Sequence, residues 1–223
     1  MSIPRYGFYL TILLAIVTLG ISGAMSLGAL VDDPGANGYA RSIFALYFSR
    51  DLADLSFLNG AEGAPMRAEL MRIQALDLYY PLAYGGMAFV FFASLGLRGV
   101  KLAWLGVILA ALTIGADLAE NEVANRILAD LEAGADPTER LDAMWGHTWI
   151  KWGFIAGYAA VMGAIMVLAR RRLLAVFPIL AAGGAGAAYV SAADPLVFNW
   201  AYQLLIPFML SIPVAAFMYS RAE

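Results

Sequence analysis

The chain has 223 residues, of which 62% are hydrophobic and only 14% are charged. A soluble globular domain carries about a quarter charged residues, so this composition indicates a protein embedded in a membrane. The net charge of -3 argues against nucleic-acid binding, which calls for a basic surface, and the lack of cysteine excludes disulfides, Fe–S clusters and thiol catalysis.

Six apolar stretches are long enough to cross a hydrocarbon core of roughly 30 Å, which takes about 20 residues of helix. They cover residues 7–30, 77–97, 101–124, 145–169, 172–191 and 196–219. We therefore predict an all-α, polytopic membrane protein that forms a single helical-bundle domain over residues 1–223. The first stretch contains Ser22-Gly23-Ala24, which loosely resembles a signal-peptidase site. It is too long for a signal-peptide core, and we expect it to be a retained anchor.

The connection after the first stretch covers residues 31–76 and is too long to be without structure. Its apolar residues recur at mixed helical spacing, interrupted by Arg50, Asp51 and Asp54. They are Ile43, Phe44, Leu46, Tyr47, Phe48, Leu52, Leu55 and Leu58. This pattern predicts an amphipathic helix at the outer surface, either as a cap packed over the bundle or as a mobile lid. A second short helix is expected through Met66–Ala75.

The charges of the connections predict the topology. The second and third stretches are joined through Arg98 and Lys101, and the fourth and fifth through Arg170, Arg171 and Arg172, with no acid at either place. By the positive-inside rule this side faces the cytoplasm, so both termini are predicted to be cytoplasmic. The connections 31–76, 125–144 and 192–195 then face outward, and they carry 12 of the 17 acidic residues. We expect a bacterial-type inner (plasma) membrane protein.

Polar residues interrupt four of the apolar stretches at one predicted depth, near the outer surface. The second has Asp77, Tyr80 and Tyr84, the third Asp117, Glu120 and Asn121, the fourth His147 and Lys151, and the sixth Asn199, Tyr202 and Gln203. Within the second, third and fourth stretches, spacings of three and four residues place these side chains on one helical face. Because ionisable groups inside a membrane usually find partners, we expect Lys151 to pair with Asp117 or Glu120.

Three interpretations of these polar residues stay open. They hold the helices in register through hydrogen bonds and an ion pair, they form a ligand-binding or catalytic site, or they are merely wetted at the membrane interface. In the second case Glu120, Asp117 and Lys151 are the candidate catalytic residues, and the others bind the ligand. His147 is more simply explained as a hydrogen-bonded residue at the interface than as a metal or tetrapyrrole ligand. We expect no metal and no cofactor.

The segment Asp77-Leu78-Tyr79-Tyr80-Pro81-Leu82-Ala83-Tyr84-Gly85, the D-x-x-E-N element from Asp117 to Asn121, and Lys151-Trp152 together resemble a pattern in bacterial multi-pass membrane proteins of unassigned function. The resemblance covers three helices, about a third of the chain. It implies that these polar positions belong together, and it implies no activity.

Three functional hypotheses follow. The first is an outer-leaflet polar pocket that binds or transforms a lipid-like or isoprenoid molecule by acid–base chemistry. The second is proton- or ion-coupled transport, which the nearly apolar inner halves of the helices disfavour. The third is a structural or assembly subunit of a membrane complex. The expected partners are membrane lipids and a small amphiphilic ligand, with a homo-oligomer or a membrane-complex partner left open.

Overall fold

The computed structural model of the chain describes residues 3–27 and 35–221, which form eight α-helices and one short 3-10 helix, η1. The elements are α1 (Ile3–Leu27), α2 (Ser42–Tyr47), η1 (Ser56–Leu58), α3 (Gly60–Asp77), α4 (Tyr80–Leu97), α5 (Ala103–Glu132), α6 (Thr138–Leu168), α7 (Arg172–Val190) and α8 (Pro195–Ser220). Helices α3 and α4 follow each other almost without interruption and count as one candidate span. Six helical units are therefore long and apolar enough to cross a membrane, which confirms the predicted all-α multi-pass architecture. The last residues of the predicted first stretch, 28–30, lie outside the described residues.

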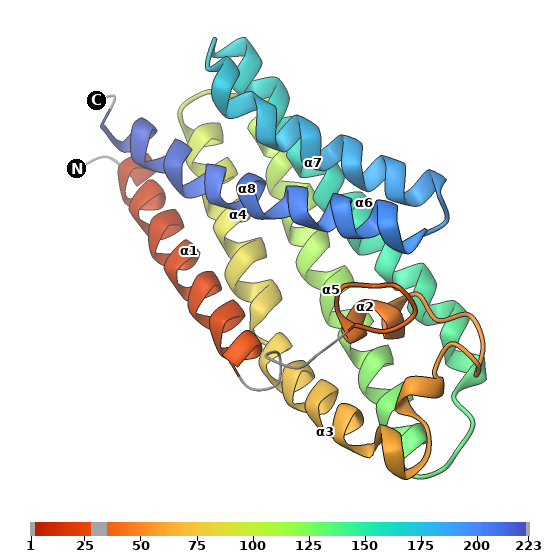
Figure 1. Cartoon of the computed structure of the whole chain (residues 1–223). Helices are drawn as coiled ribbons and strands as arrows, with labels where there is room; N and C mark the ends of the chain where they lie inside the picture. Colours follow the sequence, from red (N-terminus) through yellow and green to blue (C-terminus); the bar gives the residue numbers. More distant parts are fainter. Residues whose placement is uncertain (1–2, 28–34, 222–223) are drawn as a thin grey trace.

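The long helices pack as a closed bundle. Each of α4 to α7 contacts the next helix along the chain, and α1 closes the arrangement by packing against α4 and α8 (Figure 1). The interior is filled by buried aromatic and aliphatic side chains, among them Phe8, Phe91, Phe92, Tyr158 and Phe208. We call the end where α1 begins and α8 finishes the basic end, since it also holds Lys101 and Arg170–Arg172, and we call the opposite end the acidic end.

Two helices are longer than the predicted spans. Helix α5 has 30 residues and α6 has 31, so each is about 45 Å long at 1.5 Å per residue. Because this exceeds a hydrocarbon core of roughly 30 Å, both extend beyond it at the acidic end. The predicted loop 125–144 is thus mostly a helical hairpin, and only a short turn at Gly134, with a φ of 69°, joins the two helices.

The connection between the first two spans forms a cap over the acidic end. Within residues 35–59 it is helical over Ser42–Tyr47 and Ser56–Leu58 only, so the predicted amphipathic helix is present but short. Most of its apolar side chains, including Phe44, are buried against α5, α6 and α8, whereas Leu52 is 41% exposed. The second helix, α3, is longer than the predicted Met66–Ala75. Arg67 of α3 donates hydrogen bonds to the carbonyls of Leu58 and Gly60 and pairs with Glu132, which fixes the cap to α5.

Candidate functional site

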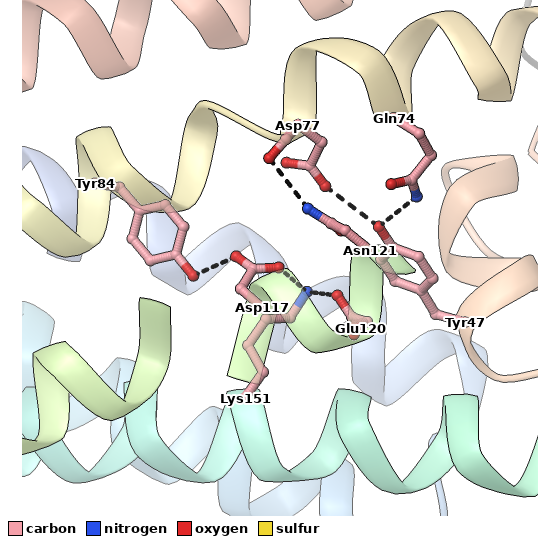
Figure 2. A network of polar contacts seen from close by, with 8 residues as sticks. All are labelled: Tyr47, Gln74, Asp77, Tyr84, Asp117, Glu120, Asn121 and Lys151. Carbon is pink, nitrogen blue, oxygen red and sulfur yellow. Dashed lines mark hydrogen bonds and ion pairs between the residues drawn. The ribbon is translucent and has the colours of Figure 1, made fainter. Parts of the chain in front are cut away.

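Lys151 joins two carboxylates of the neighbouring helix. Its Nζ donates to the Glu120 carboxylate and, at 3.2 Å, to Oδ1 of Asp117 (Figure 2). The three residues are almost fully buried, with exposed fractions of 8% for Lys151, 3% for Asp117 and 0% for Glu120. The prediction that Lys151 pairs with Asp117 or Glu120 is confirmed, and the ammonium bridges both.

Helix geometry brings these groups together. Asp117, Glu120 and Asn121 lie on one face of α5 because side chains three and four residues apart stack along a helix. Helix α6 packs along α5, and Lys151 projects from it toward that face. Thr148, nearly one turn before Lys151, is fully buried as well. Its hydroxyl lies beside Glu120 but outside hydrogen-bonding geometry.

Helix α4 supplies the second hydrogen-bond donor to Asp117. The Tyr84 hydroxyl donates to Oδ2 of Asp117 at 2.6 Å, so both oxygens of this carboxylate accept a hydrogen bond. The ring of Tyr80 packs against Tyr84, with ring centroids 5.1 Å apart. Tyr84 therefore ties α4 to the ion pair between α5 and α6.

Asp77 enters the cluster at the break between α3 and α4, and a proline explains the contact. In a continuous helix the Asp77 carbonyl would accept a hydrogen bond from the N–H of residue 81, but Pro81 has no N–H. The side-chain amide of Asn121 donates to this carbonyl instead, at 3.1 Å. Buried carbonyls need a partner, so Asn121 stabilises the break that places Asp77 beside α5.

Two residues that the sequence analysis did not include also belong to the cluster. The Tyr47 hydroxyl donates to Oδ2 of Asp77 at 3.4 Å and accepts from the Gln74 amide at 3.1 Å. The Tyr47 ring lies 4.9 Å from Nζ of Lys151, which is a cation–π contact. Burial raises the pKa of the Tyr47 hydroxyl well above its usual value of 10, and the nearby Asp77 adds to this rise. Tyr47 therefore stays protonated and can donate.

We refer to the residues that Figure 2 labels as the polar cluster. They are Tyr47, Gln74, Asp77, Tyr84, Asp117, Glu120, Asn121 and Lys151. The cluster contains three carboxyl groups and one ammonium group, all buried. Among the described residues, three of its oxygens have no hydrogen-bond donor: Oε1 of Gln74, Oε1 of Glu120 and Oδ1 of Asn121. The cluster is therefore rich in acceptors and poor in donors.

The excess of carboxyl groups over the single ammonium group has an electrostatic consequence. If all three carboxyl groups were ionised, the buried cluster would carry two uncompensated negative charges, and each such charge costs several kcal/mol away from water. A proton on at least one carboxyl group removes most of that cost. In the part of the chain that the structure describes, no three His, Cys, Asp or Glu side chains are arranged to hold a metal ion. The arrangement can hold and exchange a proton.

The other predicted site residues have different surroundings. Asn199 accepts a hydrogen bond from the Ala40 N–H at 3.0 Å and donates to the Gly38 carbonyl at 3.1 Å, so it holds the cap. The Tyr202 ring packs against the cap, 4.7 Å from the ring of Phe44. Gln203 is exposed, and His147 is partly buried on α6. None of these side chains forms a hydrogen bond with the polar cluster as the structure describes it.

Comparison with known proteins gives no relative. No family model matches the sequence, and neither a curated protein nor a solved structure is significantly similar to it. The fold and the site therefore define the class of protein by architecture alone. It is a multi-pass helical membrane bundle with a buried carboxylate–lysine cluster about halfway along α5 and α6.

Proposed function

We propose that the polar cluster is an acid–base site that binds and transforms a lipid-like or isoprenoid molecule in the outer leaflet of a bacterial-type inner membrane. Glu120 and Asp117 act as acid and base, and Lys151 stabilises negative charge that develops on the ligand. Asp77 and Tyr84 provide further polar contacts. An isomerisation, cyclisation or hydrolysis without a redox cofactor would fit this set of groups.

One observation carries the proposal, namely the surplus of buried carboxyl groups over the single ammonium group. A general acid must hold a proton and a general base must be free to accept one. A cluster of three carboxyl groups around Lys151 contains both forms at once, since full ionisation is too costly in a buried site. We assign the role of base to Asp117, whose two oxygens accept from Tyr84 and Lys151, and the role of acid to Glu120, which has one oxygen without a donor.

The arrangement of the helices supports a ligand that comes from the bilayer. Figure 1 shows α1 and α8 close together at the basic end and diverging toward the acidic end. At the basic end Phe8 and Tyr219 stack with ring centroids 5.8 Å apart. Tyr80 lies in the first turn of α4, packs against Tyr84 and is only partly buried. We propose that a ligand from the bilayer reaches the cluster past this side chain.

The charge distribution supports the orientation. Sixteen of the seventeen acidic residues lie in or next to the segments of the acidic end, whereas the connections at the basic end carry only Arg and Lys. The positive-inside rule places such connections in the cytoplasm. The polar cluster would then lie in the outer leaflet, and both termini would be cytoplasmic.

The test uses the full chain purified in mild detergent, with the lipids that copurify from the expressing cells as the probe. We compare wild type with Glu120→Gln, which keeps the size of the side chain and removes its acid. The matched control is Glu122→Gln on the same helix, because Glu122 is 60% exposed and pairs only with Arg126 one turn away. Mass spectrometry of the lipid extract measures which species are retained.

We expect wild type and Glu122→Gln to copurify with one lipid species that is enriched over the bulk lipid. With Glu120→Gln, we expect this species either to be lost or to be replaced by the chemically unchanged bulk lipid. The same lipid profile for all three proteins would overturn the proposal. The thermal unfolding temperature of Glu120→Gln shows whether the variant is folded, so that a loss of lipid is not confused with a loss of structure.

Proton-coupled transport is a second candidate, since the surplus of carboxyl groups also suits a proton-binding site. Transport needs a route from both sides. The interior between the cluster and the basic end is filled by Phe91, Phe92, Tyr158, Met162 and Phe208, which gives a proton few polar groups to follow. Proton flux into liposomes that Asp117→Asn abolishes would favour this candidate over lipid chemistry.

A further inference from the structure

A groove between α6 and α7 lies near the basic end, far along the helices from the polar cluster. It has a cavity volume of about 490 Å³ and is lined by Ala160, Ala164, Val167, Leu168, Ile179 and Ala182. The small alanine side chains leave the space that larger residues would fill. The two helices approach closely at Gly163, where an added Cβ would lie 2.8 Å from Cγ1 of Ile179.

The groove is apolar and faces outward. Val167, Leu168 and Ile179 are 48%, 76% and 50% exposed, and they belong to helices that are long and apolar enough to span a membrane. Apolar side chains on the outside of a membrane helix meet acyl chains and not water. The occupant that suits such a groove is therefore a hydrocarbon chain.

A positive charge concentration adjoins the groove. Arg170 and Arg171 lie in the turn that follows Leu168 and Ala169, and Arg172 begins α7. No side chain caps the N-terminus of α7, and the N–H groups at a helix N-terminus attract anions. Arg171 lies over the ring of Tyr219, with Cζ 4.5 Å from its centroid, and its Nη1 is buried without a hydrogen-bond partner. Among the described residues, no carboxylate forms an ion pair with any of these three arginines.

We propose that this groove and the three arginines form a binding site for an anionic phospholipid. One acyl chain lies in the groove between α6 and α7, and the phosphate of the head group contacts Arg170 and Arg172 at the membrane surface. Charge complementarity selects the lipid, because basic sites between membrane helices bind anionic head groups. The site is independent of the polar cluster, which lies toward the other end of α6.

The experiment titrates the full chain in lipid nanodiscs or detergent with phosphatidylglycerol and with phosphatidylcholine, and native mass spectrometry counts the bound molecules. Two variants probe the two halves of the site. Arg170→Gln combined with Arg172→Gln removes two charges and leaves Arg171 in place against Tyr219. Ala164→Phe fills the groove, and the milder Ala164→Leu replaces it if the first variant unfolds at a lower temperature than wild type.

Wild type should prefer phosphatidylglycerol, and the double arginine variant should lower that preference by about tenfold. Filling the groove at Ala164 should weaken the binding of phosphatidylglycerol to a similar extent. The control is Lys101→Gln, an exposed lysine of the other connection at the basic end, which should leave the preference unchanged. The proposal is overturned if the double arginine variant keeps the wild-type preference, if filling the groove leaves the binding of phosphatidylglycerol unchanged, or if Lys101→Gln reduces the preference equally.

Discussion

Replacing Lys151 by methionine removes the only ammonium group of the polar cluster and keeps most of the side-chain volume. Breaking a buried ion pair by removing one partner typically costs about 3–5 kcal/mol, because the other partner is left uncompensated. The two carboxylates, Asp117 and Glu120, do not share this cost equally. Asp117 keeps the hydroxyl of Tyr84 at 2.6 Å, whereas Glu120 is 0% exposed and loses the donor to its Oε2. We therefore expect Lys151→Met to lower the free energy of unfolding by about 3–5 kcal/mol, mainly through Glu120.

A double-mutant cycle tests that assignment. Adding Glu120→Gln to Lys151→Met removes the uncompensated acid, and we expect it to restore about 1–2 kcal/mol, within the range of coupling energies for residues in contact. Adding Asp117→Asn should restore less, since Asp117 still has a donor. Unfolding in mixed micelles of mild detergent and dodecyl sulfate gives the free energies, and the fluorescence of the buried Trp149 and Trp152 of α6 reports the transition.

The control for this cycle is Lys101→Met, an exposed lysine whose loss should change the free energy of unfolding by no more than about 0.5 kcal/mol. Strictly additive effects of Lys151→Met and Glu120→Gln would refute the reasoning. So would a Lys151→Met protein as stable as wild type. Either result would mean that the cluster carries no net charge that Lys151 has to balance.

Three further predictions concern packing and the backbone. Asn121→Ala should cost about 1–3 kcal/mol of unfolding free energy by leaving the Asp77 carbonyl unpaired, and Pro81→Ala in the same chain should reduce that cost by supplying an N–H. In α5, Gly106→Ala places a Cβ against an aromatic ring of α4 and should lower the thermal unfolding temperature, whereas Gly115→Ala meets open space and should not lower it. Arg67→Met should release the cap and speed proteolysis between residues 49 and 59, with little change in the unfolding of the spans.

The sequence predicts the spans well because a membrane makes hydropathy decisive. Every backbone group inside the hydrocarbon must be satisfied within its own helix, so apolar length alone predicts where helices cross. The same constraint predicts the pairing of Lys151 with Asp117 and Glu120, which are the acids at its depth on the neighbouring helix. The sequence could not predict the outer ends of α5 and α6, because their amphiphilic continuation into water carries no long apolar run.

Depth along a helix does not determine the direction in which a side chain points. Asn199 and Tyr202 share the predicted depth of the polar cluster, yet the packing of α8 turns them toward the cap. Tyr47 shows the opposite case. It lies in the non-spanning segment before α3, where the sequence pattern places it among the apolar residues of the predicted amphipathic helix. The fold of the cap nevertheless brings its hydroxyl to Asp77. Gln74, three residues before Asp77, offered a signal, since this spacing puts both on one helical face.

The composition of the polar cluster helps to distinguish a functional role from a purely structural one. A structural ion pair needs one acid, one base and satisfied hydrogen bonds, and apolar replacements of buried pairs are often equally stable. Asp117 with Lys151 and Tyr84 already meets that need. Glu120 and Asp77 add buried acids, and each acid that has no matching cation raises the cost of a polar network. A role in fastening the helices does not account for this surplus. The surplus supports the proposed acid–base role, since such a site must hold a proton that it can transfer.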